Sequence, residues 1–233
     1  MYNISLIGLT VTGVSIVLDT LLLLHGKNLD VEFIVDDESI SPYNRTNNNL
    51  SALNYYKNII NIKETPLNKW VPDKNRKLCI TIINSDTSKH KRSVYVKLKQ
   101  RYDVKDYMYA PIVHPSSVVS GNAKIANGVF VGPNTTVAHL AELKKFTYLS
   151  RNVSVGHDCI LGKFSSLNPN TAVGGRTTIG NNVTIGMGAT VFDKLNIGGN
   201  TLIGGGSVVT KSIPKNVVAY GSPAKVIKNN DHN

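Results

Sequence analysis

Hydrophobic residues recur at every sixth position through the second half of the chain. From Val113 to Val209, each of the 17 positions spaced six residues apart holds Val, Ile or Leu. Two positions earlier the residue is usually small or β-branched, as at Ala123, Thr171 and Ser207, and the residue just after is often glycine. Neither an α-helix nor an ordinary strand has a six-residue period, which is typical of a parallel β-solenoid.

The period predicts a left-handed parallel β-helix between about residues 113 and 213. Three six-residue segments make one triangular coil of 18 residues, and successive coils stack about 4.8 Å apart through parallel backbone hydrogen bonds. The aliphatic residues fill the interior, and the small residues leave room for them. We interpret the glycine that follows as the residue that permits each sharp corner, because glycine lacks a Cβ. The run is long enough for about five to six coils and contains no insertion.

The first 110 residues alternate between short apolar runs and longer helix-like runs. We predict strands at 3–8, 31–35 and 78–83 and helices at 12–24 and 86–101. Alternation of this kind indicates a small parallel α/β sheet. Residues 41–76 are rich in Asn and Lys, and we predict little there beyond a short helix at 51–62.

The two periods divide the chain into three parts. We expect an α/β domain at 1–110, a β-helix domain at 111–213 and a C-terminal capping tail at 214–233. The ends of a solenoid expose unpaired strand edges that need covers. The N-terminal domain and the tail are available to cover them.

Composition and charge narrow the choice of partners. The chain has 26 Lys and Arg against 15 Asp and Glu, a net charge of +11, which suits nucleic acids, phosphorylated cofactors or sugar nucleotides. The basic residues are scattered and accompany no nucleic-acid-binding motif, so we expect no nucleic-acid partner. The apolar run at 4–24 contains Asp19 and lacks a basic flank and a cleavage site, so we expect no membrane segment. Cys79 and Cys159 lie in apolar, strand-like contexts, which fits a reducing cytoplasm.

One polar corner of the predicted solenoid carries the best candidate chemistry. The hydrophobic positions on either side of the corner point inward, so His157 faces outward beside Asp158. A neighbouring carboxylate can orient an imidazole and favour its role as a base. One coil of 18 residues places His139 below His157 and Gly175 above it. The N–H of Gly175 could be free to donate a hydrogen bond.

The stacked pair His139 and His157 raises the question of a metal. The zinc site of a solenoid carbonic anhydrase class resembles such a pair, with a third histidine five residues after the upper one. That position holds Gly162 here, and His114 lies at a different point of the repeat. We therefore expect no metal site.

Longer motifs resemble those of a known family. The matching segments are Val113-His114-Pro115-Ser116, His157-Asp158-Cys159, Gly174-Gly175, Ile203-Gly204-Gly205-Gly206, Ser207-Val208-Val209-Thr210-Lys211 and Gly221-Ser222-Pro223-Ala224-Lys225. They look like bacterial hexapeptide-repeat sugar acetyltransferases of the sialic acid and bacillosamine type. The resemblance extends over essentially the whole chain.

The resemblance implies transfer of acetyl from acetyl-CoA, as co-substrate, to the amino group of a nucleotide-linked sugar. It also implies a homotrimer with each active site between neighbouring solenoids. His157 takes the position of the family's general base, and Asp158 that of the acidic residue that raises its basicity. The positions that line the acetyl-CoA site fall on Ser166, Gly175, Met187 and Gly205. Many members carry a histidine where this chain has Ser166.

This chemistry needs the groups that the corner offers. A sugar ammonium must lose a proton before or while its nitrogen attacks a thioester, and His157 would accept that proton. The developing oxyanion needs a hydrogen-bond donor, for which we favour the N–H of Gly175. The thiolate leaves without help from an acid.

In the N-terminal domain the resemblance implies a sugar-nucleotide site at the ends of the predicted strands. The acidic pair after the second strand is Asp36 and Asp37, which suits uridine or ribose groups. The glycine-rich turn after the first strand keeps its end glycines but loses the small and histidine positions between them. We expect the hydroxyls of Thr10 and Thr12 to replace the lost contacts. A further small position after the third strand falls at Asn84.

Three functions remain open at this point. The leading one is N-acetylation of a UDP- or dTDP-linked 4-amino-sugar. O-acetylation of a free sugar such as a sialic acid would need no nucleotide pocket, so replacing Asp36 and Asp37 would leave the KM for the acceptor unchanged. A solenoid that only trimerises would not bind acetyl-CoA.

Overall fold

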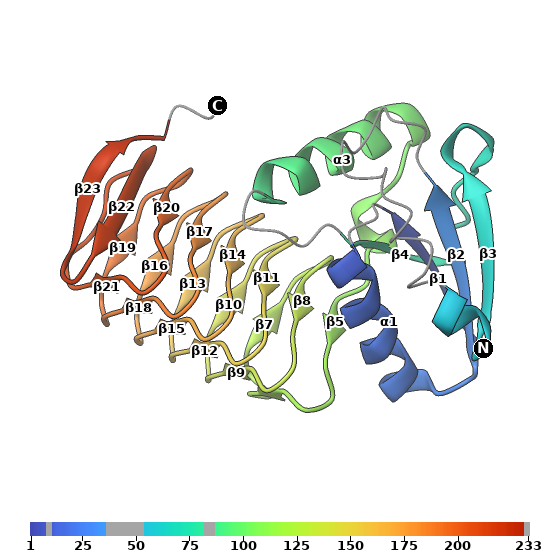
Figure 1. The fold of residues 1–233 in the computed structure, drawn as a ribbon, viewed down its shortest axis with the longest axis horizontal. Helices are drawn as coiled ribbons and strands as arrows, with labels where there is room; N and C mark the ends of the chain where they lie inside the picture. Colours follow the sequence, from blue (N-terminus) through green and yellow to red (C-terminus); the bar gives the residue numbers. More distant parts are fainter. Residues whose placement is uncertain (8–10, 36–53, 82–86, 231–233) are drawn as a thin grey trace. The chain divides into compact units, whose positions relative to one another are not determined.

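The computed structural model describes residues 1–7, 11–35, 54–81 and 87–230. The chain divides into two compact units, Met1–Ile112 and Val113–Asn233. Figure 1 shows a small sheet with helices in the first unit and a stack of triangular coils in the second.

The first unit is a parallel α/β sheet, as the sequence predicts. Its strands β1 (Tyr2–Ile7), β2 (Leu29–Val35), β3 (Asn61–Pro66) and β4 (Lys77–Ile80) pair in the order β3-β2-β1-β4. Helices α1 (Val11–His25) and α3 (Thr87–Tyr102) follow β1 and β4, close to the predicted bounds, and short 3-10 turns occupy Leu67–Lys69 and Asp106–Met108. None of the helices described here is long and apolar enough to cross a membrane.

Strand β3 is the element that the sequence analysis missed. We predicted a short helix over 51–62, but in the described part of that range only residues 54–57 are helical, and Asn61 already pairs with Asp30 of β2. The strand reads Asn-Ile-Lys-Glu-Thr-Pro and is mostly exposed. A polar strand at a sheet edge lacks the apolar enrichment by which strands are recognised.

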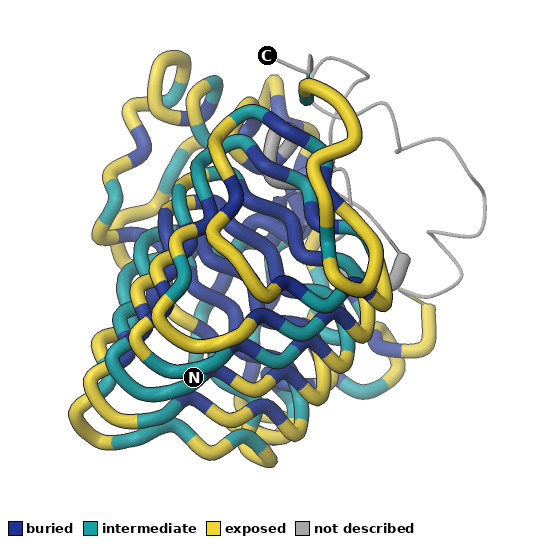
Figure 2. The backbone as a smooth tube through the Cα atoms, turned by 90° about the vertical axis from the view of Figure 1, so that its left-hand side faces the viewer, coloured by how far each residue is buried: buried dark blue, intermediate teal, exposed yellow. Residues whose placement is uncertain are grey.

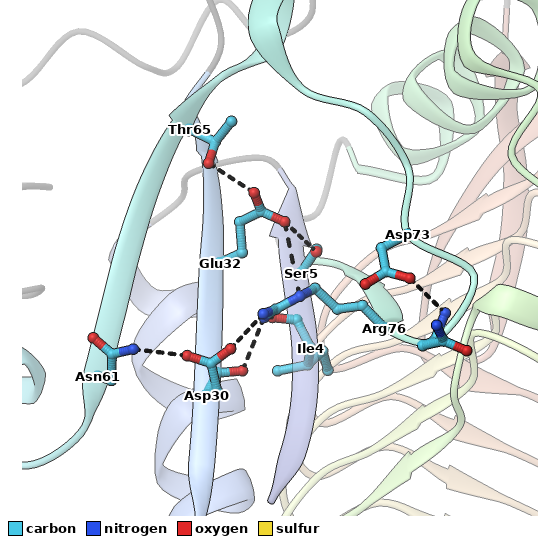
Figure 3. A network of polar contacts seen from close by, with 9 residues as sticks. Ile4, Ser5, Asp30, Glu32, Asn61, Thr65, Asp73 and Arg76 are labelled. Carbon is cyan, nitrogen blue, oxygen red and sulfur yellow. Dashed lines mark hydrogen bonds and ion pairs between the residues drawn. The ribbon is translucent and has the colours of Figure 1, made fainter.

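A network of charged and polar side chains crosses β1, β2 and β3 (Figure 3). The guanidinium of Arg76 forms an ion pair with Asp30, and its Nε lies 3.9 Å from Oε2 of Glu32. Glu32 also accepts hydrogen bonds from Ser5, at 3.0 Å, and Thr65, at 2.7 Å. These side chains are mostly withdrawn from solvent, so the mutual pairing offsets the cost of removing their charges from water.

The second unit is a left-handed parallel β-helix of mostly two-residue strands in three sheets, which confirms the predicted fold class. The eight-stranded sheet contains β5 (Ile112–Val113), β8 (Phe130–Val131), β11 (Tyr148–Leu149), β14 (Ser166–Leu167), β17 (Thr184–Ile185), β20 (Leu202–Ile203), β22 (Val217–Gly221) and β23 (Ala224–Asn229). The six-stranded sheet contains β6 (Val118–Val119), β9 (Thr136–Val137), β12 (Ser154–Val155), β15 (Ala172–Val173), β18 (Thr190–Val191) and β21 (Val208–Val209). The five-stranded sheet contains β7 (Lys124–Ile125), β10 (Glu142–Leu143), β13 (Ile160–Leu161), β16 (Thr178–Ile179) and β19 (Asn196–Ile197).

The aliphatic residues at six-residue spacing form the interior of this unit. Those from Val131 to Val209 are buried in one continuous core, while Val113, Val119 and Ile125 of the first coil are only partly buried against it. Figure 2 shows the buried positions lying within the coils and most exposed ones at their corners. At the other end, β22 pairs in parallel with β20, and β23 returns antiparallel to β22.

The corners are not made by the glycines to which we assigned them, so that interpretation was wrong. At these corners the left-handed backbone belongs to the residue three positions after the aliphatic one, as at Asn152, Asp158 and Phe164, with φ between 55° and 59°. Gly162 itself has no positive φ, but a Cβ there would lie 2.4 Å from the carbonyl carbon of Gly180. The glycine is therefore required because the backbone of the next coil passes too close for any side chain.

Candidate active site

The corner between β12 and β13 is shaped by two buried residues. Val155 and Cys159 point into the core, and the Sγ of Cys159 lies 3.1 Å from the carbonyl oxygen of Gly174 in the next coil. Between them, Asp158 adopts the left-handed conformation with φ of 55°. Its backbone N–H donates to the carbonyl of His139 one coil below, at 3.1 Å. The corner is thus held in place by the stacked coils on both sides.

This local geometry brings His157 and Asp158 together. Nδ1 of His157 lies 2.6 Å from Oδ2 of Asp158, and their side chains are 42% and 38% exposed. The hydrogen bond with His157 lowers the pKa of Asp158 below its ordinary value, with smaller contributions from the charges of His157, His139 and Arg176. Asp158 is therefore ionised near neutral pH and accepts the Nδ1–H. This tautomer leaves the lone pair of the neutral imidazole on Nε2.

Gly175 lies directly against the imidazole ring. A Cβ at this position would be 2.7 Å from Nε2 of His157 and 2.9 Å from Cδ2, so a side chain there would push the imidazole aside. Within the described residues, the Gly175 N–H donates no backbone hydrogen bond. A basic nitrogen and an unused backbone donor consequently lie side by side at one corner.

His139 occupies the same column one coil below. Its ring stacks on that of His157 with centroids 5.3 Å apart and planes inclined by 11°. His139 is exposed, whereas His157 is partly covered. The predicted vertical order of His139, His157 and Gly175 is therefore the order that the structure shows.

The other residues that resemblance assigned to acetyl-CoA lie elsewhere on this chain. Met187 and Gly205 stack on each other at the corner between the eight-stranded and six-stranded sheets, where the N–H of Gly206 donates to the carbonyl of Met187 at 2.8 Å. Met187 is 62% exposed. Ser166 lies in β14 with a buried side chain. Within one chain, the structure does not bring these residues to the corner that holds His157.

Most of the predicted sugar-nucleotide residues cannot be placed. Thr10, Asp36, Asp37 and Asn84 lie outside the described residues. Thr12 lies in the first turn of α1. Their assignment to a nucleotide site stays a prediction.

Arg176 is a neighbour of the site that the sequence analysis did not single out. It lies one coil above Asp158, its N–H donates to the carbonyl of His157 at 2.7 Å, and its charge contributes to the lowered pKa of Asp158. The 18-residue spacing that links His139 to His157 also links Asp158 to Arg176, so counting from Asp158 would have found it.

Comparisons with known proteins identify the fold, a β-helix preceded by a small α/β domain. No family model and no curated protein sequence matches the chain. Solved structures do match over nearly its full length. PerB from Caulobacter crescentus, in complex with CoA and GDP-perosamine, is 21% identical with a TM-score of 0.70, over 97% of this chain and 98% of PerB.

Two further structures share the same architecture. The acetyltransferase domain of PglB from Neisseria gonorrhoeae is 20% identical with a TM-score of 0.76, over 97% of this chain and 100% of that domain. WeeI from Acinetobacter baumannii is 20% identical with a TM-score of 0.73, over 97% and 100% of the two chains. The PglB domain has also been solved with acetyl coenzyme A. These similarities establish the fold of both units.

Proposed function

We propose that the protein is an acetyl-CoA-dependent N-acetyltransferase acting on the amino group of a nucleotide-linked amino sugar. The observation that carries the proposal is the corner where Nδ1 of His157 is bound by Asp158 and its Nε2 lies under Gly175. The matching fold of PerB, which was solved with CoA and GDP-perosamine, supports the choice of reaction.

In the proposed reaction, His157 acts as general base. Its Nε2 accepts a proton from the sugar amino group as the nitrogen attacks the acetyl carbonyl carbon of the thioester. A C–N bond forms, and the carbonyl oxygen becomes an oxyanion that the N–H of Gly175 can stabilise. The intermediate collapses when the C–S bond breaks and the CoA thiolate leaves. Asp158 stabilises the imidazolium that His157 has become, because the carboxylate is ionised and hydrogen-bonded to it.

The site is completed by a neighbouring subunit in this proposal. Met187 and Gly205 lie at a different corner of the triangular coil from His157. In a homotrimer of parallel solenoids, that corner of one subunit can face the His157 corner of another. Acetyl-CoA would then lie between subunits, with Ser166 near its path.

The acceptor is bound through its nucleotide by the N-terminal unit. Asp36 and Asp37 follow β2, Asn84 follows β4, and Thr10 and Thr12 follow β1. The carboxyl ends of parallel strands lie at one edge of a sheet, which is where such sheets bind ligands. A UDP- or dTDP-linked 4-amino-sugar is the expected acceptor. The GDP-perosamine of PerB adds a third nucleotide to be tested.

The proposal is tested by release of free CoA thiol from acetyl-CoA with a panel of acceptors. The panel contains UDP-, dTDP- and GDP-linked amino sugars and a free sialic acid. We expect turnover with an amino-sugar nucleotide, and the variant His157→Asn to lower kcat by about 10²- to 10⁴-fold, the usual contribution of a general base. The pKa of Asp158 is lowered below the ordinary value of about 3.9 for an aspartate. The rate should therefore show no titration of this carboxylate between about pH 5 and 9.

The matched control is His114→Asn, which removes a histidine from another corner of the same solenoid. Its activity should equal that of the unchanged protein. Full activity of His157→Asn would exclude the proposed base. Turnover with sialic acid but with none of the nucleotide sugars would favour O-acetylation, and no detectable binding of acetyl-CoA by calorimetry would contradict an acetyltransferase altogether.

A further inference from the structure

We propose that His139, His157 and Asp158 form a binding site for a divalent transition-metal ion of the Zn²⁺ class, through which such an ion inhibits the protein. Among the described residues, these three make the one group of His, Cys, Asp and Glu side chains that could hold a metal ion. One ligand atom from each lies within 4.8 Å of the other two. The inhibitory effect rests on the proposed function, whereas metal binding does not.

The geometry needs little adjustment to bind an ion. Zn²⁺ binds imidazole nitrogen and carboxylate oxygen at about 2.0–2.2 Å, so two ligand atoms of one tetrahedral ion lie about 3.4 Å apart. The three atoms here are within 4.8 Å of one another and must draw together. Nδ1 of His157 and Oδ2 of Asp158, hydrogen-bonded at 2.6 Å, must separate slightly to admit the ion. His139 is exposed, so its ring can rotate toward the other two ligands without disturbing the core.

In this proposal the solenoid supplies a third ligand other than histidine. We expected no metal because no third histidine occupies the position used in the solenoid zinc site. The left-handed backbone of Asp158 instead presents a carboxylate beside the ring of His157. Two imidazoles and one carboxylate are a donor set found in catalytic zinc sites, where a fourth position stays open for water or another ligand.

Binding must displace a proton that two of the ligands now share. The Nδ1–H of His157 lies between the imidazole and the carboxylate of Asp158. A metal ion bound by both groups replaces that proton, which in a neutral imidazole moves to Nε2. The positive charge of Arg176, one coil above Asp158, opposes the ion and limits its affinity. The site should therefore bind an added ion reversibly.

A bound ion would prevent the base from acting. An imidazole whose nitrogen is held by a metal, and whose carboxylate partner is also a ligand, cannot accept a proton from the sugar amine with the same geometry. His139 has no part in the proposed transfer, so its replacement separates metal binding from catalysis.

The first experiment measures Zn²⁺ binding alone. The full chain is titrated with ZnCl2 by calorimetry, for the unchanged protein, His139→Asn and His114→Asn. We expect an affinity lowered at least about tenfold in His139→Asn, since loss of even an outer partner of a metal ligand costs about 10- to 100-fold. His114→Asn should bind like the unchanged protein, because His114 belongs to no such group among the described residues.

The second experiment measures inhibition of acetyl transfer. Zn²⁺ should inhibit the unchanged protein, a chelator should restore its activity, and His139→Asn should be active but resist inhibition. Equal Zn²⁺ affinities for the unchanged protein and His139→Asn would overturn the site. Metal binding that depends on His139 in a protein without transferase activity would retain the site and reject only the proposed function.

Discussion

The solenoid and the α/β unit bury polar groups in different ways. Inside the solenoid, neutral hydroxyls repeat one bond: Thr135 donates to the carbonyl of Ser150 at 2.7 Å, and Ser165 to that of Gly180 at 2.7 Å, each reaching 15 residues ahead. Cys159 places its Sγ in the equivalent position. In the α/β unit, the buried hydroxyls of Ser5 and Thr65 instead join partly buried charged side chains, among which Arg76 reaches back 46 residues to Asp30.

The difference shows how each unit determines its fold. Successive coils of the solenoid repeat the same contacts with their neighbours. The fold of the solenoid therefore follows from the six-residue period that is visible in the sequence. The α/β unit depends on particular partners far apart in the chain, and removal of one leaves partly buried charges unpaired. Substitutions should therefore damage the solenoid through steric crowding and the α/β unit through lost charge pairing.

The largest expected effect is that of Gly162→Ala. Its Cβ would lie 2.4 Å from the carbonyl carbon of Gly180, so the two coils must separate locally. We expect a loss of about 3 kcal/mol in the free energy of unfolding, the upper range for overpacked sites. Chemical unfolding followed by circular dichroism measures it. Gly121→Ala is the matched control, because a Cβ there meets no atom within 4 Å; equal losses in the two variants would argue against crowding.

A smaller effect is expected from Arg76→Met in the other unit. It leaves the carboxylates of Asp30 and Glu32, whose side chains are 18% and 12% exposed, without their cation. Because some solvent reaches them, we expect a loss of about 2 kcal/mol, below the range for fully buried pairs.

Hydrogen exchange followed by mass spectrometry locates this loss. Protection should fall in β1 and β2 and stay unchanged in the solenoid strands. Lys57→Met is the control, because its ion pair with Glu64 has side chains that are 38% and 34% exposed, and exposed pairs contribute about 0–1 kcal/mol. If both variants lost protection equally, the Arg76 network would have no special role.

The smallest effect is expected from Thr135→Val, which keeps the shape of the solenoid core and removes one repeated bond. The hydroxyl of Thr135 donates to Ser150 and accepts from the N–H of Val153 at 3.3 Å. Leaving these backbone groups unpaired should cost about 1–2 kcal/mol, measured by thermal unfolding. Thr136→Val changes the exposed neighbouring residue and should have little effect. A neutral Thr135→Val would mean that packing alone holds the coils.

Most strands and helices with a strong apolar pattern were predictable. The solenoid interior, β1, β2, β4 and α1 lie near their predicted positions, as does the basic helix α3. The polar edge strand β3 gave no such signal, because its stability comes from pairing with β2. The role of Gly162 was also hidden, because the atoms that exclude a Cβ belong to the next coil.

At the candidate site, the sequence by itself determined which residues share a column. The count of 18 residues placed His139, His157 and Gly175 one above another, because parallel coils repeat without slipping. Only the tertiary structure decided the distances: the contact of Gly175 with the imidazole, the hydrogen bond of Asp158 to Nδ1, and the proximity of three metal-binding side chains. The physical reason is that a repeat fixes the register of backbones, whereas side-chain contacts depend on the conformation of each corner and on the coils stacked against it.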